Sequence, residues 1–286
     1  MNTRKLTTKC SRTALGVQKV VLSKSTDFER YEGREMISQD LLDRTFKHYE
    51  KNKNCELIVN PSLPILYFGN LPEYRESNQK IITVAKNPSG NEFRLRKTDS
   101  FSFCRFPDWD PRARNLQAVL NAYFQNTPLE WFSSYRAILK PMNSSFESKT
   151  GLPNRVIHTD ICTPLATDPT WTGLPWSIRE QLADEGFPIW RSLLEELQPD
   201  LILVSIPRNH FESIFIEEKT LLIEFTEKKN GEKRKYPYEV LLTHYPIASG
   251  KRVKVVFGNP AQTPFGSLSN EQRNEIGRVI RSDVLG

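Results

Sequence analysis

The fold is decided by the stretch Ile81-Ile82-Thr83-Val84-Ala85, which passes directly into Lys86-Asn87-Pro88-Ser89-Gly90. The first half is apolar and rich in β-branched residues, as in a strand that is covered on both faces in a parallel sheet. The second half combines Asn, Pro and Gly, which predicts a turn where the strand ends. In parallel α/β sheets, ligands bind outside the carboxyl ends of the strands, so a site is expected at this turn.

The same kind of apolar run recurs three times along the chain, at Val156-Ile157-His158, at Leu201–Val204 and over residues 253–257. Helical patterns lie between the runs: one begins at Pro111, one covers residues 188–197, and one follows Ser269. Alternating strands and helices predict an α/β fold, a three-layer αβα sandwich around a central four-stranded parallel sheet.

Two segments fall outside this alternation. Residues 1–60 are polar and form an N-terminal extension, with one helix expected after Ser38, so the α/β domain would cover residues 61–286. A β-hairpin insertion is expected at about residues 212–247, where two strand-like runs, 220–225 and 239–243, flank a basic turn. A solvated hairpin tip explains that turn, and an accessory DNA contact is the alternative.

Composition limits the class of protein. The chain has 286 residues, 38% of them hydrophobic, and a net charge of +6, which suits a folded protein with a polyanionic partner. No apolar run is long enough to span a bilayer, and no signal-peptide pattern follows the first residues, so a cytoplasmic monomer without membrane contact is expected. The cysteines (Cys10, Cys55, Cys104 and Cys162) form no close pair, so neither a metal nor a disulfide framework is expected.

Three polar turns follow the predicted strands. The first contains Asn87-Pro88, the second runs from Thr159 to Leu165, and the last begins with Gly258-Asn259-Pro260. Each Asn-Pro pair taken alone is an ordinary turn initiator. Because the carboxyl ends of parallel strands meet at one edge of a sheet, we expect the three turns to form one mouth.

These turns resemble the motifs of the uracil-DNA glycosylase superfamily. The first is similar to the water-positioning Gly-x-Asn-Pro-Gly motif of the mismatch-specific and single-strand-selective branches, and the last resembles the second motif, His/Asn-Pro-Ser. The segment from His158 to Leu165 resembles His-Asn-x-Cys-Pro-Leu, with one extra residue before the proline. The resemblance covers roughly residues 78–282 without the hairpin, and implies a DNA glycosylase that flips out a base and cleaves its N-glycosidic bond without a cofactor.

The resemblance also implies roles for single residues. Asn87 would orient the attacking water, and Asn259 would stabilise the departing base or the DNA phosphate. The residues after Asn259 would help to hold the opened duplex, on either duplex or single-stranded DNA; they are Pro260, Ala261 and Gln262. Phe101, with Phe103 as its substitute, lies where the family places the aromatic residue that stacks on the base, although a core aromatic explains either residue equally well.

Two departures from the family bear on specificity. Asp160 takes the place of the Asn that reads uracil, and a carboxylate accepts from the N4 amine of cytosine but repels O4 of uracil. If it were protonated, Asp160 would also donate to cytosine N3; a turn cap or an Arg partner is the alternative role. Pro88 is followed by Ser89 instead of a Tyr, which leaves the C5 side of the base open. Together they favour a C5-modified cytosine, such as the glucosylated hydroxymethylcytosine of phage DNA, and therefore a defence enzyme.

Basic residues near the strand ends are candidates for contact with DNA. Arg94, Arg96 and Lys97 follow the first motif and would bind phosphates, with a solvated loop as the alternative. Arg208 and His210 follow the third strand, where helix capping explains His210 equally well. A repair glycosylase for uracil or another deaminated base, and a non-catalytic module that binds DNA or a partner, remain as rival functions.

Overall fold

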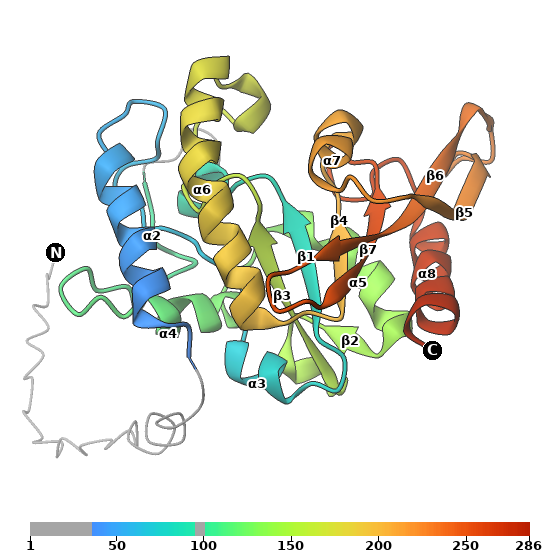
Figure 1. The fold of residues 1–286 in the computed structure, drawn as a ribbon, viewed down its shortest axis with the longest axis horizontal. Coiled ribbons are helices and arrows are strands. Elements are labelled where there is room, and N and C mark those ends of the chain that lie inside the picture. Colours follow the sequence, from blue (N-terminus) through green and yellow to red (C-terminus); the bar gives the residue numbers. More distant parts are fainter. Residues whose placement is uncertain (1–35, 95–100) are drawn as a thin grey trace, which may run out of the picture. The chain divides into compact units, whose positions relative to one another are not determined.

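The computed structural model describes residues 36–94 and 101–286, which fold around one seven-stranded mixed sheet with the strand order β2-β3-β1-β4-β7-β6-β5 (Figure 1). The strands, in chain order, are β1 Ile81–Ala85, β2 Ser144–Ser145, β3 Asn154–Asp160, β4 Leu201–Val204, β5 Thr220–Glu227, β6 Lys233–Pro246 and β7 Arg252–Gly258. The α-helices are α2 Gln39–Asn52, α3 Leu71–Glu76, α4 Leu116–Asn121, α5 Ser133–Leu139, α6 Trp176–Leu197, α7 Arg208–Ile214 and α8 Asn270–Val279. The chain is therefore an α/β protein.

The prediction of a four-stranded parallel sheet was too narrow. The four expected strands do pair in parallel as a block in the order β3-β1-β4-β7. The short strand β2 extends the parallel block at one edge, and β6 and β5 extend the sheet at the other in antiparallel orientation. Two residues leave no readable periodicity, which explains why β2 was missed. The expected hairpin is longer than its apolar runs indicated, because the second half of β6 pairs with the whole of β7.

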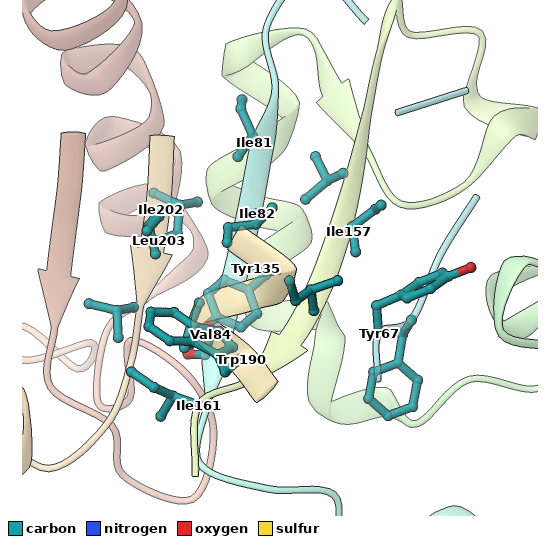
Figure 2. Close-up of a cluster of buried hydrophobic side chains, with 14 of the residues drawn as sticks. Tyr67, Ile81, Ile82, Val84, Tyr135, Ile157, Ile161, Trp190, Ile202 and Leu203 are labelled. Atoms are coloured by element: carbon teal, nitrogen blue, oxygen red, sulfur yellow. Dashed lines mark hydrogen bonds between the residues drawn. The ribbon is translucent and has the colours of Figure 1, made fainter. Parts of the chain in front are cut away.

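The two faces of β3 show how the layers form. Thr159 faces α6, since the indole Nε1 of Trp190 donates to its hydroxyl at 3.1 Å. The neighbouring His158 faces the opposite layer, where its ring lies 6.1 Å from that of Tyr135 on α5. Period-two alternation thus places helices on both faces of the sheet. Figure 2 shows the core side chains around β1, β3 and β4, among them Ile82, Ile157 and Leu203.

All four predicted helices are present, and two of them begin at other residues than expected. The helices after Ser38 and Ser269 are confirmed, and each Ser hydroxyl accepts from a backbone N–H of the first turn. The helix expected from Pro111 begins only at Leu116, because residues 111–114 form turns. The helix expected over residues 188–197 begins twelve residues earlier, at Trp176, and contains Pro188.

Residues Glu35–Gly286 form one compact unit, so the expected boundary at residue 60 falls inside it. Helix α2 packs beside α6 (Figure 1) and buries Leu41 and Leu42 against the core. Ile58 and Val59 are also buried, because the chain before β1 runs along the loop that follows β3; Val59 N–H donates to Ala166 O at 2.9 Å. Among the helices of residues 36–94 and 101–286, none is long and apolar enough to cross a membrane.

Candidate active site

The turns after β1, β3 and β7 open onto one cavity of about 750 Å³ at the carboxyl ends of the strands. The strand register places these turns together, since Ala85 pairs with Asp160 and Val204 with Phe257. Sequence-predicted residues that line the cavity are Asn87, Pro88, Ser89, Asp160, Asn259, Pro260, Ala261 and Gln262. The expected single mouth is therefore present, and its volume lies in the usual range of ligand pockets, ~300–1,000 Å³.

The first turn holds Asn87 in one orientation. Its Nδ2 donates to the carbonyl oxygen of Pro88 at 2.8 Å, to that of Leu165 at 3.3 Å and to the hydroxyl of Thr167 at 2.9 Å. Thr167 is itself fixed, because its backbone N–H donates to Pro88 O and its O accepts from Gly90 N–H. The amide is thus locked with its donor side inward, and Oδ1, which accepts from no described residue, is left to meet a ligand.

Ser89 begins the short 3-10 helix η1, Gly90–Phe93. Its hydroxyl accepts from Asn91 N–H at 3.3 Å, so the small side chain caps the turn at the cavity wall. The turn after β3 lies against helix α6 at a glycine. A β-carbon on Gly186 of α6 would collide with the carbonyl oxygen of Cys162 in this turn. This close approach of α6 fixes the turn that follows Asp160.

Asp160 ends β3 as a buried acceptor without a donor. Its side chain is 2% exposed, and Oδ1 has no hydrogen-bond partner among the described residues. His158 Nε2 lies 3.7 Å from Oδ1, beyond hydrogen-bond distance, while His158 Nδ1 lies 2.8 Å from the hydroxyl of Thr83. Within residues 36–94 and 101–286, Asp160 forms neither of its alternative roles, a turn cap or a pair with an Arg. A buried, unpaired carboxylate oxygen in a cavity indicates a place for a ligand donor.

The sequence analysis missed Glu92, a second carboxyl group in the same cavity. Glu92 is 4% exposed, and its Oε2 accepts from the hydroxyl of Tyr123 at 2.8 Å. Burial raises the pKa of Glu92 to about 8, and nearby Asp160 adds to this, against the opposing effects of Tyr123 and Arg105. The one available signal was position, since Glu92 follows Asn87 by five residues and precedes the buried Phe93.

The aromatic wall of the cavity differs from the expected one. It is formed by Phe68, Trp131, Phe132 and Trp171. The ring of Phe132 lies 5.0 Å from that of His158. Phe68 is held there by backbone hydrogen bonds in both directions with His158. Phe101 and Phe103 lie outside the cavity lining and pack around Phe93, at ring distances of 5.7 and 5.8 Å.

The last turn is rigid at its base and exposed at its tip. A β-carbon on Gly258 would collide with the ring of Phe265, so only glycine allows the chain to fold back here. Ser205 joins both ends of the turn, donating to Gly258 O at 2.8 Å and accepting from Phe265 N–H at 2.9 Å. The carbonyl oxygen of Asn259 accepts from Tyr238 at 2.6 Å, whereas Ala261 and Gln262 are exposed.

Two of the predicted DNA-contact residues, Arg94 and Arg208, form ion pairs within the protein. Arg94 pairs with Asp168 at 2.9 Å, and Arg208 pairs with Glu212 at 3.0 Å and Glu239 at 2.7 Å. His210 lines a separate cavity of about 300 Å³, where its Nε2 lies 3.9 Å from the buried thiol of Cys162. Arg96 and Lys97 lie outside the described residues.

The hairpin β5–β6 is tied to the last turn. Arg234 donates to Ser267 O at 2.5 Å, and Tyr238 donates to Asn259 O. Residues 234–237 stand opposite a single residue of β5, since the pair Glu227–Lys233 is followed by Phe225–Tyr238. Such bulges turn side chains out of the sheet, and Lys235 and the 73% exposed Tyr236 point to solvent here. The hairpin therefore extends the surface beside the cavity mouth.

Comparison with known proteins gives no family model and no curated protein that matches this chain. The chemistry of the cavity is therefore the guide to function.

Proposed function

We propose that the protein is a DNA glycosylase with a fold of the uracil-DNA glycosylase type, which excises a C5-modified cytosine and leaves an abasic site. The observation that carries this proposal is the pairing of Asn87 and Asp160 in one cavity. Asn87 offers only an acceptor, and Asp160 offers a buried acceptor that lacks a donor. A water molecule and a base with an amino group would satisfy them in turn.

The reaction needs a positioned water more than it needs a strong base. As the C1′–N1 bond breaks, its electron pair goes to the base and positive charge develops on the sugar, which water then attacks at C1′. Oδ1 of Asn87 accepts a hydrogen bond from this water and thereby directs an oxygen lone pair at C1′. Because Nδ2 is held by three acceptors, the amide does not have to reorganise when the water binds.

Selection of the base would follow from Asp160 and Ser89, which both line the cavity. The amine at N4 of cytosine donates to Oδ1 of Asp160, whereas O4 of uracil would place an acceptor against a carboxylate. Ser89 leaves room at the C5 side, because its hydroxyl is turned to Asn91 N–H. A pocket that accepted plain cytosine would damage the cell's own DNA, so a required C5 substituent is the consistent substrate feature.

DNA would lie across the last turn and the hairpin. The exposed Gln262 and Ala261 stand at the mouth, in position to support the opened strand. Residues 228–235 carry five cations against one anion, and Lys228 alone of these lysines forms an ion pair within the described residues. Counterion release by the remaining lysines would supply sequence-independent affinity.

The test is an abasic-site assay on matched oligonucleotides. Four substrates would contain uracil, cytosine, 5-hydroxymethylcytosine or glucosylated 5-hydroxymethylcytosine, and alkali would cleave any abasic product. We expect cleavage with a modified cytosine, and a loss of about 100-fold or more in Asn87→Ala. Asn91→Ala is the matched control, since this Asn lines the same cavity with an exposed side chain. Release of uracil alone would refute the cytosine assignment, and no product from any substrate would refute the enzyme.

A further inference from the structure

The buried carboxyl group of Glu92 has no part in the chemistry described so far. It lies on η1, directly after the turn that holds Asn87, and lines the same cavity as Asp160. Tyr123 engages Oε2, whereas Oε1 accepts from no described residue. One oxygen atom is thus anchored to the protein and the other is available to a ligand.

Burial and Asp160 favour the neutral form of Glu92, against its hydrogen bond with Tyr123 and the charge of Arg105. Tyr123 of the 3-10 helix η2, Tyr123–Gln125, faces it as a donor, Arg105 of the preceding loop lies with Nε 3.9 Å from Oε2, and Asp160 faces it from β3. The distance to Arg105 is longer than a hydrogen bond, so the one cation does not bind the carboxylate closely. Burial and the second carboxyl group prevail, and the pKa of Glu92 rises to about 8.

Resting on the proposed function, we infer that Glu92 is the hydrogen-bond donor of the pocket and that its Oε1–H binds an acceptor of the excised base, N3 or O2 of the cytosine ring. Asp160 and Glu92 then divide the two tasks between them. The carboxylate of Asp160 accepts from the amine at N4, and the neutral carboxyl of Glu92 donates to the ring. This pattern of one acceptor and one donor matches the polar edge of a cytosine-type base that has been flipped out of the stack. Glu92 is therefore a specificity-determining residue, held in place by Tyr123.

The inference makes a pH-dependent claim. An ionised Glu92 cannot donate, so excision by the wild-type protein should fall about tenfold for each pH unit above pH 8. Gln offers an N–H donor of nearly the same shape at every pH, so Glu92→Gln should remain active and lose this alkaline decline. Glu130→Gln is the matched control, because Glu130 is an exposed carboxylate on the rim of the same cavity and should leave the decline unchanged.

Single-turnover rates from pH 6.5 to 9.5 on the best substrate decide between the outcomes. If Glu92→Gln keeps the wild-type decline, or is inactive while it still binds the DNA, the donor role is wrong and the glycosylase assignment stands. If the wild-type protein releases no base, the proposed function fails. Binding of free 5-hydroxymethylcytosine, followed by the intrinsic tryptophan fluorescence to which Trp131 and Trp171 of the cavity contribute, still tests Glu92. Binding that is lost at pH 9 only in the wild type supports the inference, and absent or pH-independent binding overturns it.

Discussion

Glu92→Gln should also change how the stability of the protein depends on pH. The pKa of Glu92 is about 8 in the folded protein, against 4.5 for an ordinary Glu. Between these two values the folded protein holds a proton on Glu92 that the unfolded chain has released. The free energy of unfolding therefore contains a contribution that is complete below pH 4.5 and is lost as the pH rises through 8.

The size of this contribution follows from the two pKa values. A difference of one pKa unit corresponds to ~1.4 kcal/mol, so the gap between about 8 and 4.5 is worth at most about 5 kcal/mol. That is a large part of the ~5–15 kcal/mol by which a typical domain is stable. Gln does not titrate, so the stability of the variant should contain no contribution from this group and should not fall through the same pH range.

Urea unfolding of both proteins at pH 5, 7 and 9 measures the effect. We expect the stability of Glu92→Gln relative to wild type to increase by several kcal/mol from pH 5 to pH 9, since only the wild type has to ionise a buried carboxyl group. Glu130→Gln, which removes an exposed carboxylate, should show no such trend. Parallel pH profiles for wild type and Glu92→Gln would refute the assignment of a neutral, buried Glu92.

Three further changes test other parts of the site. Asp160→Asn is expected to move base preference towards uracil, measured as the ratio of abasic product from the two bases; an unchanged ratio would contradict its role. The double variant Lys233→Gln, Lys235→Gln should weaken DNA binding and lower the slope of log affinity against log salt by roughly 2. The control variant Lys140→Gln, Lys149→Gln, whose lysines lie near the amino ends of the strands, should leave this slope unchanged. Gly258→Ala should cost about 1–3 kcal/mol of stability in thermal unfolding because its β-carbon collides with Phe265, whereas Gly90→Ala, whose β-carbon would find ordinary contacts, should cost less.

The sequence predicts the parts of this protein that depend on local pattern. The runs at Ile81, Val156, Leu201 and Val253 identify strands because a strand buried on both faces must be apolar throughout. The same rule places Asn87, Asp160 and Asn259 together, since each lies at or just after the carboxyl end of a parallel strand. The wider sheet was not predicted, because the hairpin at about residues 212–247 was expected to be an insertion outside the sheet, whereas β6 pairs with β7 directly across the short turn 247–251.

The cavity residues that the sequence did not predict are brought there by packing between segments that are distant in the chain. Phe68 reaches the cavity by pairing with His158, and Trp131 by packing against the same ring at 5.4 Å. No local spacing connects these residues. Phe101 and Phe103 show the opposite case: their position in the sequence resembles that of the base-stacking aromatic in uracil-DNA glycosylases, but their rings pack around Phe93.

In the proposed reaction, selectivity between bases would depend on the hydrogen bond to Oδ1 of Asp160, which a wrong base cannot donate. A buried acceptor that a bound base leaves unpaired costs ~1–3 kcal/mol. Oδ1 of Asp160 meets no donor among the described residues, so a base with an amine at that place would avoid this cost, whereas a base with a carbonyl there would lose its own solvation and add repulsion. Sites of this kind reject the analogue that lacks the hydrogen bond far better than an apolar pocket rejects a change in size. In the proposed reaction, Asp160 and Glu92 would therefore distinguish bases by the donors and acceptors of the ring, and the open wall at Ser89 would accommodate the substituent at C5.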